Sequence, residues 1–386
     1  MTSLHRRHIL CGGLALSLAG AGRVRAQVAG ARPKLVVLIA RGALDGLSLT
    51  VPYADPNHRA LRGDLAVAGP GEPGGALELT GGFGLHPAMP LTHGLFQAGQ
   101  MRFAPAVAIP ARIRSHFDAQ DVLESGADSV RGQTDGWLNR ALAATGGAPL
   151  KALSVGAQTP LILRGAAPTT SWAPGREVSR DDRLVSQLMD LYATDPLLGP
   201  GLARGLETDA MAEGGAIRRN DVAALGQAVA RLMTGEAGAD VVALSVDGWD
   251  THARQAPQMI QRLGGLDGLI GGLRDGLGPD WDRTVMLLAT EFGRTARANG
   301  TGGTDHGTAS SLLLMGGAIR PGGPIGDWPT LAEGRLYEGR DLASTLDVRA
   351  VFKGVLRDHL GVDRAALDGL VFPGGSAAAR AVDGLV

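Results

Sequence analysis

The chain has 386 residues, of which 44% are hydrophobic and 19% are charged, a balance that excludes an intrinsically disordered chain. Its 37 Lys and Arg residues nearly match its 38 Asp and Glu residues, and this near-neutral charge argues against a nucleic-acid-binding protein. Its 59 glycines follow no triplet repeat, which excludes collagen. No apolar stretch approaches the ~20 residues that a membrane-spanning helix needs.

The first 26 residues have the layout of an export signal. Arg6 and Arg7 precede a short apolar run over 9–19, and a small-residue cleavage site follows. The adjacent arginines indicate the twin-arginine route, so we expect a periplasmic or secreted protein that the twin-arginine translocase exports. A basic N-terminal helix is the alternative. Cys11, the only cysteine, falls in this segment, so we expect the mature chain to have no disulfide and no thiolate metal ligand.

The mature chain, residues 27–386, has the pattern of one α/β domain. Short unbroken apolar runs are typical of buried parallel strands, and they occur at 34–40, 101–109, 150–155, 241–246, 284–290 and 310–315. Apolar residues at three- and four-residue spacing predict helices over 222–233 and 259–277. This alternation predicts a mostly parallel central sheet with helices on both faces. Two segments rich in Gly, Pro and polar residues, 63–85 and 165–216, are predicted to be insertions on this domain.

Polar residues follow directly after several of these apolar runs. In parallel sheets, functional groups gather at the carboxyl ends of the strands. The candidates there are Asp45, Ser115, His116, Asp250, His252, Glu291, Arg294, Asp305 and His306. Carboxylates and imidazoles without cysteine suit Zn²⁺, Mn²⁺ or Fe, so we expect a divalent metal site.

Each pair of candidates also has a purely structural interpretation. Asp250 and His252 would point to the same side of an extended segment and could bind one ion, although Asp250 could also cap a helix beginning near Thr251. Asp305 and His306 lie between glycines, where backbone can approach a ligand closely, or they form a surface turn. The Asp45-Gly46 pair is also common turn chemistry.

Ser115 is the candidate nucleophile. The pattern Ser115-x-x-Asp118 resembles a capping box, so its hydroxyl could cap a helix, with or without a role in a site. A helix N-terminus favours a phosphate or sulfate group, and His116 and Gln120 would share one helical face there. Glu291 could be a ligand or general base, while Arg294 could clamp an anion or pair with Glu291. The sequence lacks the P-loop, H-E-x-x-H, G-x-S-x-G and strand-linked G-x-G-x-x-G motifs, which argues against the enzyme classes that use them.

Six segments in order resemble one exported bacterial family, known as domain of unknown function number 1501 and usually carrying a twin-arginine signal. They begin at Arg41, Arg114, Gly136, Gly248, Glu291 and Gly303 and read RGALDGLSLTVPY, RSHFDAQ, GWLNR, GWDTH, EFGRT and GTDHG. The resemblance covers almost the whole mature chain, and the family name conveys no activity.

A more distant resemblance is to the alkaline phosphatase-like superfamily of phosphatases, sulfatases and cofactor-independent phosphoglycerate mutases. It implies that Asp45, Asp250 (or Asp247), His252, Glu291 and His306 bind metal and that Ser115 is the nucleophile, assisted by Arg294 or Arg114. The chain departs from the superfamily pattern at Phe292, where a histidine is expected; His116 or Asp305 could supply the missing ligand, or one ion could bind instead of two.

The sequence therefore predicts an exported, metal-dependent hydrolase of phosphate or sulfate esters on small molecules or glycans. We expect Zn²⁺, Mn²⁺, Fe or Ca²⁺ as the cofactor, no nucleic-acid partner and no membrane span. The alternative is a non-catalytic binding or assembly protein on the same scaffold, because fold does not imply function. A metal-dependent periplasmic oxidoreductase is a third hypothesis, which would leave Ser115 and the strand order unexplained.

Overall fold

The computed structural model describes residues 32–147, 149–174, 182–192, 194–196, 198–212, 221–374 and 379–386. The predicted export signal lies outside these residues. The strands are β1 (Lys34–Arg41), β2 (Thr50–Val51), β3 (Leu77–Glu78), β4 (Gly84–Leu85), β5 (Met101–Ala108), β6 (Ala152–Val155), β7 (Thr169–Trp172), β8 (Val241–Asp247), β9 (Thr284–Ala289), β10 (Ser310–Met315) and β11 (Leu346–Asp347). Each of the apolar runs singled out in the sequence forms a strand of the central sheet.

The helices alternate with these strands along the chain. They are α1 (Gly46–Leu49), α2 (His58–Arg62), α3 (Pro90–Gln97), α4 (His116–Ser125), α5 (Trp137–Ala144), α6 (Asp182–Tyr192), α7 (Leu198–Met211), α8 (Val222–Met233), α9 (Gln255–Leu277), α10 (Val348–Leu360) and α11 (Arg364–Ala366). Shorter helical turns are η1 (Gly63–Leu65), η2 (Leu161–Leu163), η3 (Gly278–Arg283), η4 (Glu333–Arg335) and η5 (Leu367–Val371).

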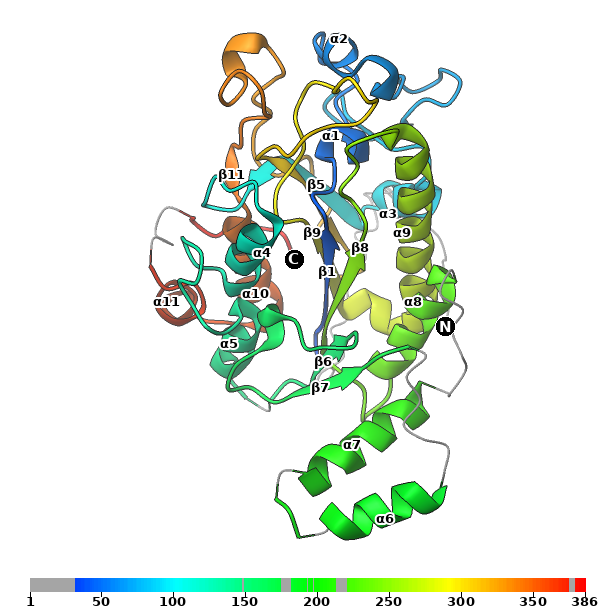
Figure 1. Cartoon of the computed structure of the whole chain (residues 1–386), viewed down its shortest axis with the longest axis vertical. Helices are drawn as coiled ribbons and strands as arrows, with labels where there is room; N and C mark the ends of the chain where they lie inside the picture. Colours follow the sequence, from blue (N-terminus) through cyan, green and yellow to red (C-terminus); the bar gives the residue numbers. More distant parts are fainter. Residues whose placement is uncertain are drawn as a thin grey trace, which may run out of the picture. The chain divides into compact units, whose positions relative to one another are not determined.

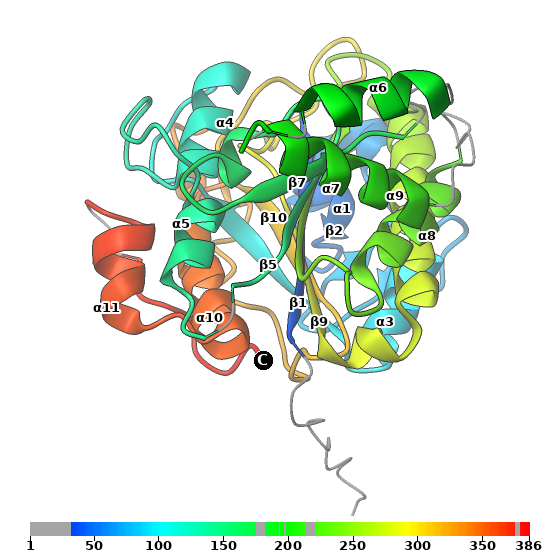
Figure 2. The same ribbon diagram turned by 90° about the horizontal axis from the view of Figure 1, so that it is seen from below.

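Within the described residues, eight strands form one sheet in the order β11-β5-β10-β9-β1-β8-β6-β7. Strand β1 pairs in parallel with β8 and β9, and only β10 runs antiparallel to its neighbours. Figure 1 and Figure 2 show α4, α5 and α10 on one face of this sheet and α3, α8 and α9 on the other. The predicted fold class, a mostly parallel sheet with helices on both faces, is confirmed.

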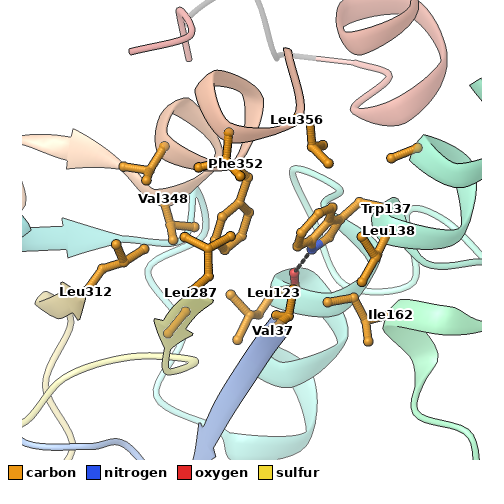
Figure 3. Close-up of a cluster of buried hydrophobic side chains, with 14 of the residues drawn as sticks. Val37, Leu123, Trp137, Leu138, Ile162, Leu287, Leu312, Val348, Phe352 and Leu356 are labelled. Carbon is orange, nitrogen blue, oxygen red and sulfur yellow. Dashed lines mark hydrogen bonds between the residues drawn. The ribbon is translucent and has the colours of Figure 1, made fainter. Parts of the chain in front are cut away.

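Both faces of the sheet carry a hydrophobic core, because successive side chains of a strand point to opposite faces. Val37 of β1 packs in the core under α4, α5 and α10, and its neighbour Leu38 packs in the core under α8 and α9. In the first core the rings of Trp137 and Phe352 stack with centroids 4.7 Å apart (Figure 3). The Trp137 indole N–H donates to the Leu123 carbonyl at 3.0 Å, so burial of this ring leaves no polar atom unpaired.

The two predicted insertions differ from each other in the structure. Residues 63–85 contribute β3 and β4, which pair with β2 in a small antiparallel sheet. Residues 165–216 include α6 and α7, but they also supply β7, which pairs in parallel with β6 at the edge of the main sheet. The insertion prediction is therefore wrong for Thr169–Trp172.

Residues 32–386 form one compact unit. No helix in the described part of the chain combines the length and the hydrophobicity required to cross a membrane.

Candidate metal centre

The candidate residues come together from four segments that follow strands of the central sheet. Strand β5 leads to His116 at the start of α4, β8 leads to Asp250 and His252, and β9 leads to Glu291. His306 lies in the loop before β10, opposite Arg294 in a short antiparallel bridge. As in other parallel sheets, the functional side chains gather where the strands end.

Three imidazole nitrogens and the two carboxylate oxygens of Asp250 form the centre of the site. His306 Nε2 lies 3.1 Å from His116 Nε2, 3.0 Å from His252 Nε2 and 3.0 Å from Asp250 Oδ1. His252 Nε2 lies 2.9 Å from Asp250 Oδ1, and His116 Nε2 lies 3.4 Å from Asp250 Oδ2. Two atoms that bind one zinc ion at about 2.0–2.1 Å lie about 3.3 Å apart, so each of these separations fits a pair of ligands of the same ion.

Within the described residues, one group of at least three His, Cys, Asp or Glu side chains brings ligand atoms within 4.8 Å of one another: His116, Asp250 and His306. His252 joins this group through its contacts with Asp250 and His306. We call these four side chains the His/Asp cluster. A group that could hold a metal ion is thus present: its donors are the imidazoles of His116 and His306 and the Asp250 carboxylate, with the His252 imidazole beside them.

Acceptors behind the cluster hold the rings so that Nε2 faces inward. His116 Nδ1 lies 2.8 Å from Glu291 Oε1, and His306 Nδ1 lies 2.8 Å from the Arg114 carbonyl. Because both partners can only accept, each Nδ1 carries the proton, and a neutral ring then directs the Nε2 lone pair inward. His252 Nδ1 has the same relation to Asp305 Oδ1 at 3.4 Å. Acceptors placed in this way behind ligand histidines are typical of metal sites.

Hydrogen bonds among the residues of the site shift their pKa values. Burial alone would raise the pKa of Glu291, but hydrogen bonds from His116, Gly42 N–H and Gln120 lower it below its usual value. The hydrogen bond to Glu291 in turn raises the pKa of His116. Partial burial would also raise the pKa of Asp250, yet donors led by Arg294 lower it to about 2. Both carboxylates therefore stay ionised and attract a cation.

Phe292 and Arg294 pack against the cluster. Phe292 lies under His116 with ring centroids 4.9 Å apart and also contacts His306 at 5.1 Å. Arg294 is fully buried; its Nη1 donates to Asp250 Oδ1 at 2.7 Å and its Nη2 donates to the Thr304 carbonyl. The prediction that Arg294 clamps an anion or pairs with Glu291 is therefore corrected: its guanidinium holds Asp250.

Glycines allow the loop that carries His306 to approach the other ligands. A Cβ atom on Gly303 would collide with the His252 backbone, and one on Gly307 would lie 2.5 Å from the Arg294 carbonyl carbon. Gly307 N–H donates to the Gly293 carbonyl at 2.8 Å. These glycines let the His306 loop pack closely against the segments that carry His252 and Arg294, while close approach of this backbone to a ligand stays a prediction.

Asp45, a predicted metal ligand, takes part instead in a buried ion pair. Its Oδ2 accepts hydrogen bonds from Arg62, Gln255 and, at 2.8 Å, Ser48 Oγ, while Oδ1 accepts from Leu47 N–H at 3.2 Å. Burial alone would raise the pKa of Asp45, but the Arg62 guanidinium and Ser48 lower it. These donors occupy the carboxylate, so the structure corrects the predicted role: Asp45 caps α1 and neutralises Arg62.

A buried chain of hydrogen bonds joins this ion pair to the cluster. Gln255 Nε2 donates to Asp45, and Thr304 Oγ1 donates to Gln255 Oε1 at 2.6 Å. Arg294 Nε donates to Thr304 Oγ1 at 3.1 Å, and Arg294 then holds Asp250. Sequence reasoning did not identify Gln255, Thr304 or Arg62, because contacts such as that of Gln255 with Asp45, 210 residues away, arise only in the folded chain.

The remaining candidates fall behind or beside the cluster. Glu291 and Asp305, both predicted as ligands, contact the Nδ1 atoms of His116 and His252 and so orient ligands rather than join the central atoms. His116, predicted as a catalytic residue, belongs to the cluster itself. Gln120 donates to Glu291 Oε1 at 3.1 Å, in agreement with the shared helical face expected for His116 and Gln120.

Ser115 immediately precedes α4 in extended backbone and is exposed. Its side chain makes no cap hydrogen bond, so the capping-box prediction is wrong for this hydroxyl. Asp250 does not cap a helix either, because α9 begins at Gln255 after Arg254. The alternative structural interpretations of these two residues are thereby removed.

The fold and the site define an α/β protein with a candidate His/Asp metal centre at the strand ends. The chain belongs to the family described as "Protein of unknown function (DUF1501)", whose model matches residues 99–371. This confirms the first resemblance found in the sequence. A search of curated proteins gave no match.

Several solved structures are similar to this chain at low identity. "Ps i-CgsB in complex with k-i-k-neocarrahexaose" has a TM-score of 0.42 and 12% identity over 91% of this chain and 77% of its own. A phosphonate monoester hydrolase of Agrobacterium radiobacter has a TM-score of 0.37 and 12% identity over 86% and 74%. An alkaline phosphatase from the Antarctic bacterium TAB5 has a TM-score of 0.35 and 12% identity over 74% and 91%. At these identities and TM-scores the similarities carry no argument about function, which must come from the site.

Proposed function

We propose that this chain is an exported, metal-dependent hydrolase of phosphate or sulfate esters. The observation that supports this most is the inward direction of the imidazole Nε2 atoms around Asp250 Oδ1. Without a cation, neutral rings in these tautomers would point lone pairs at one another and at a carboxylate. A divalent ion bound between His116, His306 and Asp250 would remove that repulsion.

The donor set narrows the metal that we propose. Imidazole nitrogens together with a carboxylate suit Zn²⁺ or Mn²⁺, whereas Ca²⁺ prefers a shell of oxygen atoms. The ligand side chains remain 23–47% exposed, so the centre faces solvent and leaves room for a substrate oxygen. Such an ion, when bound, would lower the pKa of a bound water or hydroxyl and neutralise charge on a leaving oxygen.

We propose Ser115 as the nucleophile. It is the residue before His116, and its exposed hydroxyl is not engaged by the helix that follows. The N–H groups at the start of α4, a ten-residue helix, point toward the same region and would hold the anionic oxygens of the transferred group. Arg294 would act only through Asp250, whose carboxylate it keeps in place.

The test uses 4-nitrophenyl phosphate and 4-nitrophenyl sulfate with the zinc- or manganese-loaded chain. We expect turnover of at least one ester and a loss of at least about 100-fold in kcat for Ser115→Ala, the size of a typical catalytic-group effect. Ser129→Ala, an exposed serine after α4, is the matched control and should retain activity. Unchanged turnover in Ser115→Ala would remove Ser115 from the mechanism.

A non-catalytic binding or assembly protein on the same scaffold is the second candidate. It is favoured by one observation: no side chain among the described residues donates to or accepts from the Ser115 hydroxyl, so no general base contacts it. If a loaded, folded wild-type chain hydrolyses neither ester, this second function is the better account.

Export through the twin-arginine route rests on residues 1–26 alone. We expect replacement of Arg6 and Arg7 by Lys to retain the protein in the cytoplasm, while the wild-type chain reaches the periplasm or the medium. Fractionation of cells followed by immunodetection measures this directly, and equal export of both chains would contradict the proposal.

A further inference from the structure

A cavity of about 420 Å³ lies beside the His/Asp cluster. Its walls come from α2, from the loop over 295–305 and from the segment over 331–340. The volume falls within the range of small-molecule sites in proteins. None of the roles described above uses this cavity.

Two residues of the cavity wall contact the cluster directly. Asp305 lines the cavity, and its Oδ1 lies 3.4 Å from His252 Nδ1. Arg340 also lines it and donates from Nη2 to the His306 carbonyl at 2.9 Å. A molecule in the cavity would therefore be separated from two metal-ligating histidines by a single residue.

The wall carries Arg297 and Arg340 against Asp305 and Glu333, and Arg297 is the cation that could receive an anionic group. Arg297 is exposed in the cavity, and among the described residues no carboxylate or other acceptor contacts its guanidinium. Asp305 is already engaged by Asn299 at 3.2 Å and by His252, so it needs no cation from a ligand. Glu333, the other carboxylate of the wall, is exposed on η4.

The floor of the cavity is apolar. Leu61 and Leu331 are buried beneath it, and Leu336 and Ala298 are partly exposed to it. An organic group bound here would remove this surface from water, and the free energy gained is proportional to the apolar area that it covers. The wall thus offers an apolar surface with a cation beside it.

We propose that this cavity binds the non-reacting part of the substrate, and that this part carries its own acidic group. The substrate class is then an ester with a second anionic group on the leaving-group side, recognised by Arg297. This inference rests on the proposed ester hydrolysis for the reaction, but the binding that it predicts is independent of turnover.

The experiment compares 4-carboxyphenyl phosphate with 4-methylphenyl phosphate as substrates, and the two leaving groups 4-hydroxybenzoate and 4-methylphenol as ligands in calorimetric titrations. Exposed ion pairs typically contribute about 0.2–1 kcal/mol, so we expect the carboxylated member of each pair to be favoured by about 1.4- to five-fold. Arg297→Gln should abolish this preference. Arg335→Gln is the matched control, because Arg335 is an exposed arginine of the wall segment over 331–340 that does not line the cavity, and this variant should keep the preference.

This design distinguishes a failure of the proposed hydrolysis from a failure of the proposed binding in the cavity. If neither phosphate is hydrolysed, the proposed reaction fails, while the titrations still decide whether the cavity prefers the carboxylate. Equal binding of 4-hydroxybenzoate and 4-methylphenol to the wild-type chain overturns the inference, as does a preference that persists in Arg297→Gln.

Discussion

Glu291 gives the sharpest prediction about how the protein holds its metal. The carboxylate is fully buried, and its Oε1 accepts from His116 Nδ1 and Gly42 N–H at 2.8 Å each and from Gln120 Nε2 at 3.1 Å. Thr290 Oγ1 donates to Oε2 at 3.0 Å. Glu291→Gln preserves this shape: the amide oxygen takes the place of Oε1, and the amide nitrogen can donate to the Thr290 hydroxyl.

The substitution removes only the charge behind His116. Loss of such a partner weakens metal affinity by about 10–100-fold, which corresponds to about 1.4–2.7 kcal/mol. Because the shape and the hydrogen bonds remain, we expect the free energy of unfolding of the metal-free chain to change by less than about 1 kcal/mol. Competition with a colorimetric zinc chelator measures the Kd, and urea unfolding in the presence of a chelator measures the stability.

The matched control is Glu124→Gln, a buried carboxylate in the same network that pairs with Arg41 at 2.6 Å and contacts no imidazole. It should lose stability and keep its zinc affinity. Wild-type affinity in Glu291→Gln would refute the reasoning, because Glu291 would then not orient His116. A loss as large as that of His116→Ala would instead make Glu291 a direct ligand.

Three further predictions concern stability. Asp45→Asn should cost about 3–5 kcal/mol in urea unfolding, because it leaves a buried guanidinium uncompensated, while the saturating metal stoichiometry stays unchanged; full stability would contradict the buried ion pair. Burial lowers the pKa of both His58 and His86 to about 4 from 6.5, so the folded state binds fewer protons, and stability present above pH 6.5 is lost as the pH falls toward 4. At pH 5 each histidine lowers the free energy of unfolding by about 2 kcal/mol. His58→Gln or His86→Asn should therefore reduce the difference in unfolding free energy between pH 7.5 and pH 5 by that amount. An unchanged difference would show that the histidine is not buried in its neutral form. Gly303→Ala should destabilise the chain by about 1–3 kcal/mol and weaken zinc binding, since its Cβ would displace the His252 backbone, and an unaffected variant would show that the loop can shift without cost.

The strands of the central sheet could be predicted from the sequence because they are buried on both faces and therefore consist of unbroken apolar runs. The run over 34–40 became β1, and 310–315 became β10. The direction of β10 was not accessible, because apolar periodicity carries no information on whether a strand runs parallel or antiparallel. The edge strand Thr169–Trp172 was missed because it is short and partly exposed, so it resembles a polar loop in the sequence.

For the site, the sequence could predict only which residue types lie near one another at the strand ends. Asp250, His252 and His306 were found because polar residues at strand ends converge in such sheets. The division into ligands and supporting groups depends on contacts such as that of His116 with Glu291, which lie 175 residues apart in sequence. Asp45 was assigned as a ligand because the sequence does not reveal that Arg62 and Gln255 surround its carboxylate.

The central claim is that the His/Asp cluster binds one divalent ion. The most direct test is the metal stoichiometry of the folded chain after equilibrium dialysis against micromolar Zn²⁺ or Mn²⁺, for the wild type and for His306→Ala, which removes the imidazole that contacts the other three ligands. We predict about one equivalent per wild-type chain and a small fraction of that in the variant. A folded wild-type chain that binds neither ion, or a variant that binds as much as the wild type, would contradict the account.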